Sequence, residues 1–234
     1  MGEHGKHRTL VGPLIALALW AGAVPAAAQC RLALVLGMDI SSSVDPDEDR
    51  LQRQGLARAL MAPEVQRAAF ALPDSPVALA IYEWSGRYQQ KLIVDWTILN
   101  GQEDLARAAR AVATSERSYA EFPTALGFAI GYAASIFERG PPCLFKTLDI
   151  SGDGSNNDGF GPDRAYEHFP LAEVTVNGLS IGGHDKEVAD YYRRELLRGP
   201  GAFLEQATGF EDFERAMRKK LEREMGVRVL GAVR

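Results

Sequence analysis

Apolar runs and amphipathic segments alternate along most of the chain. Continuous apolar runs, which are typical of buried strands, span residues 32–39, 77–85, 143–154 and 173–183. Residues 88–96 are more polar in their first half, as in an edge strand, and 201–207 is a short last strand. Apolar residues recur at helical spacing over 45–61, 101–114, 124–138, 186–197 and 210–225. This alternation predicts a doubly wound α/β domain with a mostly parallel central sheet and helices on both faces.

Composition and charge narrow the possible functions. The chain has 234 residues, of which 46% are hydrophobic and 24% charged, as in one globular domain with a sizeable core. The net charge of −5 gives no excess of positive charge for binding phosphates, so we expect no nucleic-acid partner. We interpret the charges of the last helix as a solvated face: Arg215, Arg218, Lys219, Lys220, Arg223, Glu214, Glu222 and Glu224.

The first 28 residues have the pattern of a signal peptide. Lys6 and Arg8 precede an apolar run, and an Ala-x-Ala sequence predicts cleavage after Ala28. We therefore expect a domain over 29–226 and a tail over 227–234. No second apolar stretch of about 20 residues follows, so we expect an exported protein without a membrane span, periplasmic or else extracellular. In an oxidising compartment, its two cysteines favour a disulfide over half of a zinc site.

Candidate ligands follow the ends of predicted strands. Asp39, Ser41 and Ser43 form Asp-x-Ser-x-Ser directly after the first apolar run, Thr124 opens a helix, and Asp153 ends a later strand. Ligands of parallel sheets bind beyond the carboxyl ends of the strands. Oxygen donors of this kind suit a hard cation such as Mg²⁺, Ca²⁺ or Mn²⁺ rather than zinc.

This set of residues resembles the von Willebrand factor A (VWA) domain, over roughly residues 30–226. All five positions of the family's metal-ion-dependent adhesion site (MIDAS) are present, although Pro123 stands where many members have glycine. The "DISGDGSNNDG" loop and the single exported domain look most like a group of exported bacterial VWA-like proteins of unknown function. The resemblance implies one antiparallel edge strand and a divalent cation, Mg²⁺ first, held by the serines, the threonine and the aspartates.

The resemblance also implies a function and a disulfide. An open coordination position would recruit a protein or peptide that supplies an Asp or Glu carboxylate. Neighbouring parallel strands would bring Cys30 and Cys143 together at the end opposite the metal, because each lies nine or ten residues before its aspartate. The candidate residues for the rim of the ligand face are Tyr119, Phe122, Asn156, Phe160 and His184.

Two alternatives to this non-enzymatic binding module remain. One is a metal-assisted hydrolase of phosphate esters, because Mg²⁺ at the end of a parallel sheet also serves such enzymes. Phosphotransferases of this layout usually carry a second aspartate two residues after the first, where this chain has Ser41, and no Ser-His-Asp or Cys-His set is apparent. The other alternative is a structural VWA scaffold without metal.

Overall fold

A computed structural model describes residues 1–2, 30–182 and 186–227, so the signal-peptide prediction for 1–28 and most of the tail fall outside the described residues. The strands are β1 Cys30–Asp39, β2 Val77–Trp84, β3 Gln90–Leu99, β4 Cys143–Gly152, β5 Val174–Ile181 and β6 Leu204–Ala207. The α-helices are α1 Pro46–Leu60, α2 Pro63–Ala69, α3 Gln102–Ala113, α4 Leu126–Glu138, α5 Pro162–His168, α6 Lys186–Tyr191 and α7 Phe213–Met225. A π-helical turn, Tyr192–Leu196, follows α6, and a 3₁₀ turn, Phe210–Asp212, precedes α7.

The six strands form one sheet in the order β3-β2-β1-β4-β5-β6. All neighbours are parallel except the edge strand β3, which pairs antiparallel with β2. Every residue of β1, β2 and β5 is buried, whereas in β3 only Val94 and Leu99 are buried. The predicted doubly wound sheet with one antiparallel edge strand is therefore confirmed.

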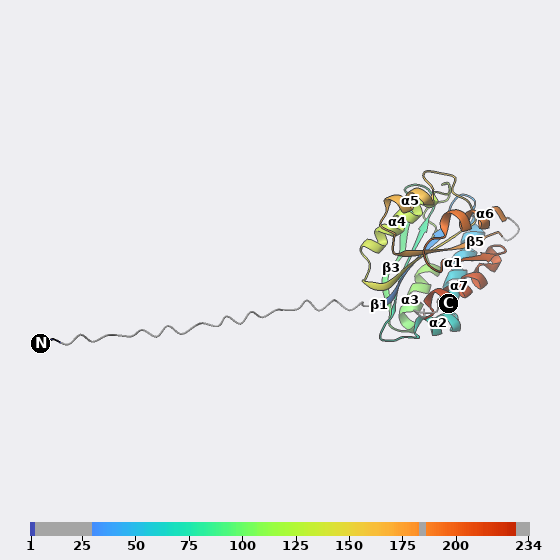
Figure 1. Cartoon of the computed structure of the whole chain (residues 1–234). Coiled ribbons are helices and arrows are strands. Elements are labelled where there is room, and N and C mark those ends of the chain that lie inside the picture. The colour runs from blue at the N-terminus through green and yellow to red at the C-terminus, as the bar shows by residue number, and fades with distance from the viewer. Residues whose placement is uncertain (3–29, 183–185, 228–234) are drawn as a thin grey trace, which may run out of the picture.

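Helices cover both faces of the sheet and enclose two apolar cores. One core joins α1, α2, α3 and α7 to one face of β1 and β2, and the other joins α4, α5, α6 and the π-helical turn to the opposite face. Figure 1 shows α4 and α5 lying apart from α2, α3 and α7. Within the described residues, no helix is both long enough and apolar enough to span a membrane.

Local chemistry explains how α1 begins. The side chain of Asp45 accepts hydrogen bonds from the backbone N–H groups of Asp47 and Glu48, and the Glu48 carboxylate accepts one from the N–H of Asp45. This capping box satisfies N–H groups that a helix start leaves unpaired. The helix therefore starts immediately after the Asp-x-Ser-x-Ser loop and fixes where that loop ends.

Two short helices, α2 and α5, were not predicted from the sequence. Each has seven residues and begins with a proline, Pro63 or Pro162. Seven residues make about two helical turns, which is too short for a hydrophobic period to stand out. The predicted helix over 186–197 is also interrupted, because its second half is the π-helical turn.

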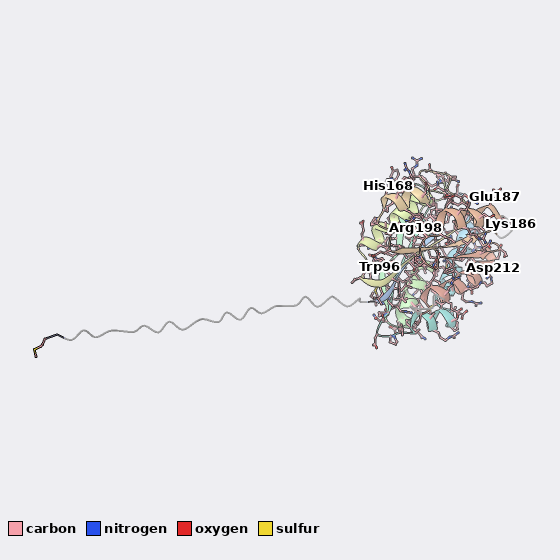
Figure 2. The ribbon with its side chains drawn as sticks, viewed as in Figure 1. Trp96, His168, Lys186, Glu187, Arg198 and Asp212 are labelled. Atoms are coloured by element: carbon pink, nitrogen blue, oxygen red, sulfur yellow. A yellow bond between two sulfur atoms is a disulfide. The ribbon has the colours of Figure 1, made fainter. Side chains whose placement is uncertain are left out.

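The edge strand is fastened to the helix layer by Trp96 of β3, which Figure 2 labels. Its indole N–H donates a 3.0 Å hydrogen bond to the carbonyl oxygen of Ile136, and its ring lies 6.0 Å from that of Phe137. Both partners belong to α4. The indole therefore holds the edge strand to the last turns of that helix.

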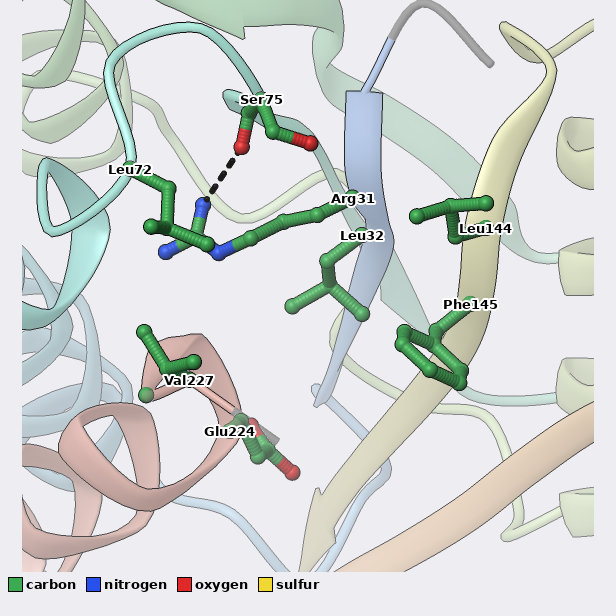
Figure 3. Close-up of a pocket in the computed structure, with 9 residues that line it drawn as sticks. Arg31, Leu32, Leu72, Ser75, Leu144, Phe145, Glu224 and Val227 are labelled. Atoms are coloured by element: carbon green, nitrogen blue, oxygen red, sulfur yellow. Dashed lines mark hydrogen bonds between the residues drawn. The ribbon is translucent and has the colours of Figure 1, made fainter. Parts of the chain in front are cut away.

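The predicted disulfide is confirmed at the edge of the sheet where β1 and β4 begin. Cys30 and Cys143 stand opposite each other in the parallel register and are bonded, with 4.6 Å between their Cα atoms. A cavity of about 150 Å³ lies at this same edge, lined by Arg31, Leu32, Leu72, Ser75, Leu144, Phe145, Glu224, Gly226 and Val227. Figure 3 shows Arg31 reaching from β1 to the backbone oxygen of Ser75. The metal-ligand candidates lie at the opposite edge.

The interpretation of the last helix as wholly solvated is wrong for two of its residues. Lys220 and Glu224 are 0% and 1% exposed. Lys220 lies 2.7 Å from Glu224 and 3.2 Å from Asp149 of β4, and Asn177 of β5 donates a 2.7 Å hydrogen bond to Glu224. The helical period places these two charges on the sheet side of α7, where a cross-layer ion pair compensates their burial.

Candidate metal centre

The five candidate ligands come from three loops at one edge of the sheet. Asp39 is the last residue of β1, and Ser41 and Ser43 follow it before α1. Thr124 precedes α4, and Asp153 follows β4. Because β1 and β4 are parallel neighbours with Met38 opposite Ser151, their carboxyl ends bring the two aspartates to the same edge.

Hydrogen bonds link these side chains into one cluster. The hydroxyl of Ser43 donates to Oδ1 of Asp153 at 2.8 Å, and its oxygen lies 3.1 Å from that of Ser41. Thr124 donates its hydroxyl to Ser41 at 3.2 Å, and the N–H of Ser41 bonds Oδ1 of Asp39 at 2.8 Å. The structure therefore assembles all five residues that the sequence singled out, from positions up to 114 residues apart.

Burial makes it unfavourable for the carboxyl groups of Asp39 and Asp153 to carry a negative charge without a counter-ion. Asp39 is 0% exposed, and among the described residues its Oδ2 has no hydrogen-bond partner. Burial, and next the charge of Asp153, raise the pKa of Asp39 to about 7, although hydrogen bonds from Ser41 and the charge of Arg117 oppose the shift. Burial also raises the pKa of Asp153. A cation would relieve both costs.

The donor set suits a hard divalent cation. Three hydroxyls and two carboxylates offer only oxygen, and within the described residues Oδ2 of one carboxylate, that of Asp39, is unpaired. Across the described part of the chain, no group of three or more His, Cys, Asp and Glu residues could hold a metal ion. Any ion at this edge would therefore depend on the hydroxyls of Ser41, Ser43 and Thr124.

Arg117 is a residue of this site for which the sequence held no signal. Its guanidinium donates hydrogen bonds to the carbonyl oxygens of Ile40, Ser41 and Val44 at 2.8, 2.7 and 2.7 Å. These oxygens belong to the loop that carries Ser41 and Ser43. One side chain from the α3–α4 connection thus fixes the backbone of the β1–α1 loop.

A buried ion-pair network supports the segment that carries Arg117. Arg53 of α1 bonds the carboxylates of Asp49 and Glu83 at 2.9 and 2.6 Å, and it donates to the hydroxyl of Ser115 at 2.7 Å. The second carboxylate oxygen of Glu83 accepts the N–H of Ser118. Residues on both sides of Arg117 are therefore tied to α1 and β2.

Two asparagines after β4 hold the segment that carries Thr124. Asn157 accepts the N–H of Thr124 at 2.9 Å, and Asn156 accepts the N–H of Leu126 at 2.7 Å. Asp158 pairs with Arg87 at 2.7 Å, which joins the same loop to the β2–β3 connection. The side chain of Asn156, a candidate for the rim, is thus engaged with the start of α4.

The other rim candidates differ in how far they are free to meet a ligand. The rings of Tyr119 and Phe122 pack edge to face at 5.7 Å, and Phe122 is 37% exposed beside the loop whose Ser42 N–H bonds its carbonyl oxygen. Phe160 stacks on Phe128 at 4.2 Å and is partly buried. His184 lies outside the described residues.

Solved structures with the same fold identify the architecture. The zinc-occupied form of proximal thread matrix protein 1 from the mussel byssus, described with a MIDAS motif, is similar with a TM-score of 0.60 and 13% identity, over 84% of this chain and 46% of that one. A von Willebrand factor type A protein from Catenulispora acidiphila has a TM-score of 0.62 and 18% identity, over 84% and 43%. This chain therefore spans less than half the length of either protein.

An aerotolerance-related membrane protein from Bacteroides fragilis is similar over nearly its full length, with a TM-score of 0.55 and 14% identity over 82% of this chain and 99% of that one. At these identities the likeness establishes the fold, which is that of a VWA domain. The chain belongs to the family described as "Protein of unknown function (DUF1194)", whose model matches residues 29–229. No curated protein matches it.

Proposed function

We propose that this protein is an exported binding module that holds a divalent cation, Mg²⁺ in the first place and Mn²⁺ or Ca²⁺ as alternatives, through Asp39, Ser41, Ser43, Thr124 and Asp153. One observation carries the proposal. Residues from three separate loops converge on a single hydrogen-bonded cluster, in which the buried Oδ2 of Asp39 has no partner within the described residues. The zinc-occupied MIDAS of the mussel protein supports a divalent ion at this edge of the fold.

The partner that we propose is a protein or peptide that supplies an Asp or Glu carboxylate. Mg²⁺ prefers six oxygen ligands, and these five side chains leave room for an acidic group or water. Ser43 and the neighbouring Ser42 are exposed, and Phe122 stands beside them, so an acidic side chain has access from solvent. The pilus adhesin SpaC of Lactobacillus rhamnosus GG shares the fold at 12% identity, which makes adhesion a reasonable class of function.

We further propose that the module is not an enzyme and acts outside the cytoplasm. The Cys30–Cys143 disulfide supports export, because such bonds persist in oxidising compartments. The bound ion would supply positive charge for a carboxylate, whereas Ser41 stands where a phosphotransferase of this layout would carry its second aspartate. Turnover of a phosphate ester that Asp39→Asn abolishes would replace this proposal with the hydrolase.

Calorimetric titration of residues 29–234 with Mg²⁺, Mn²⁺ and Ca²⁺ tests the metal site. We expect saturable binding with one ion per chain, lost in Asp39→Asn and in Ser43→Ala. Asp47→Asn is the matched control, because Asp47 is an exposed acid near the same loop and its carboxylate pairs with Arg50 on its own helix. An equal loss of metal binding in Asp47→Asn would indicate non-specific attraction of cations. Absence of binding by the unaltered protein would favour the alternative of a structural scaffold without metal.

A further inference from the structure

The side chain of Tyr192 approaches the candidate metal site from the buried core of the protein. Tyr192 begins the π-helical turn that follows α6, and the N–H of Leu197 bonds its carbonyl oxygen at 3.0 Å, five residues back along the chain. The side chain is 0% exposed and belongs to the apolar core on the face of the sheet that α4, α5 and α6 cover. Single π-helical turns inside helices are frequent at functional sites.

The hydroxyl of Tyr192 and the carboxylate of Asp39 border the same small space. A Cβ atom added to Gly152 would lie 2.5 Å from the hydroxyl oxygen and 2.7 Å from Oδ2 of Asp39. Gly152 ends β4, immediately before Asp153, so the absence of a side chain there keeps this space open. A side chain at this position would force the hydroxyl or the carboxylate to shift.

Neither group is otherwise satisfied. The Tyr192 hydroxyl and Oδ2 of Asp39 are both buried, and neither bonds any residue that the structure describes. A phenol can donate one hydrogen bond, and a carboxylate oxygen can accept two. Buried polar groups without partners are costly, so a donor and an acceptor that face one space are expected to be joined by a hydrogen bond, direct or through water.

We propose that Tyr192 is a positioning residue for the metal site, whose hydroxyl donates to Oδ2 of Asp39 directly or through one water molecule. The N–H of Ser41 already holds Oδ1 of the same carboxylate, so the two donors together fix its plane. Oδ2 keeps a second lone pair for the ion or for its water ligand. This inference rests on the proposed function, because it assigns a role toward the ion at Asp39.

Binding of Mn²⁺ alone to the full mature chain tests this role. Partners of metal ligands typically change affinity by about 10–100-fold when they are removed, so we expect Tyr192→Phe to bind Mn²⁺ that much more weakly. Tyr166→Phe is the matched control, because the Tyr166 hydroxyl bonds the carbonyl oxygen of Leu196 at the other end of the same turn. Tyr166→Phe should keep the affinity of the unaltered protein.

A second measurement needs no metal. If the hydroxyl bonds Asp39, the effects of Tyr192→Phe and Asp39→Ala on denaturant unfolding in a chelator should be non-additive, whereas those of Tyr166→Phe and Asp39→Ala should add. Unchanged Mn²⁺ affinity in Tyr192→Phe, or additive effects of the Tyr192 and Asp39 substitutions on unfolding, would overturn the role of Tyr192. The proposal of a metal site would then still stand. Absence of Mn²⁺ binding by the unaltered protein would overturn the proposed function itself.

Discussion

The guanidinium of Arg117 donates a 2.7 Å hydrogen bond to the carbonyl oxygen of Ser41. The two residues are 76 positions apart, and Arg117 also bonds the carbonyls on either side, at Ile40 and Val44. The Asp-x-Ser-x-Ser loop therefore does not hold its shape through its own residues alone. The geometry of the candidate ligands therefore depends on the guanidinium of Arg117, which belongs to a different loop.

Replacement of Arg117 by glutamine should weaken both the fold and the metal site. Loss of the guanidinium removes a donor from the partly buried carbonyl oxygens of Ile40, Ser41 and Val44, although that of Ser41 still accepts the N–H of Val44. The lost hydrogen bonds cost about 1–3 kcal/mol in unfolding free energy. A looser loop should also lower Mn²⁺ affinity by about tenfold or more, as for other groups that orient metal ligands. Urea unfolding and calorimetric titration measure the two effects. Arg110→Gln, at an exposed position on α3, is the control and should change neither.

Lys220 should be essential for stability although it lies far from the metal site. It lies 2.7 Å from Glu224 and 3.2 Å from Asp149, so Lys220→Met removes the positive charge from a buried cluster of carboxyl groups. Removal of one partner from a buried ion pair costs about 3–5 kcal/mol. The adjacent Lys219→Met is a matched control, because its ammonium is exposed and pairs with Glu205 at the surface, worth at most about 1 kcal/mol. Equal midpoints of urea unfolding for the two variants would contradict this account.

Asp149 should give the stability a distinct pH dependence. Burial, and next the charge of Glu224, raise the pKa of Asp149 well above its ordinary value despite the opposing charge of Lys220. The folded state therefore binds the proton more tightly than the unfolded state. This contribution to stability is present below the unfolded carboxyl pKa of about 3.9 and is lost as the pH rises toward the folded pKa.

Asp149→Asn removes this titration. The unfolding free energy of the variant, minus that of the unaltered protein, should therefore increase as the pH rises above about 4, by at most about 1.4 kcal/mol per pH unit. Urea unfolding at several pH values gives the difference directly. A difference that stays constant, or that decreases with pH, would show that Asp149 is ionised in the folded protein throughout this range.

Loss of the Cys30–Cys143 bond should lower stability without altering the metal site. The bond closes a loop of 113 residues, for which the chain-entropy model gives up to about 4.7 kcal/mol. The two cysteines begin β1 and β4, whereas the candidate ligands lie at the other ends of these strands. We expect a lower melting temperature in reductant with unchanged Mn²⁺ affinity. The Cys30→Ala/Cys143→Ala double variant should melt like the reduced protein and be insensitive to reductant.

Much of the fold could be predicted from the sequence because it is encoded locally. Apolar runs mark the buried strands, helical spacing marks the longer helices, and Asp45 marks where α1 begins. The candidate ligands were also predictable, since each directly follows or precedes such an element. The disulfide pairing was predictable through the resemblance to the VWA domain, which implies that the strands of Cys30 and Cys143 are parallel neighbours.

Only the tertiary structure decided which other residues serve the site. Arg117, Tyr192 and Gly152 reach Asp39 and its loop from three distant segments, and no local pattern distinguishes them from other residues of their type. The burial of Lys220 was hidden for a related reason. The charged residues beside it, Lys219 and Glu222, are exposed, and its own charge is compensated by residues of β4 and α7. Hydrophobic period and capping act between near neighbours, whereas desolvation and long-range hydrogen bonds depend on which segments pack together.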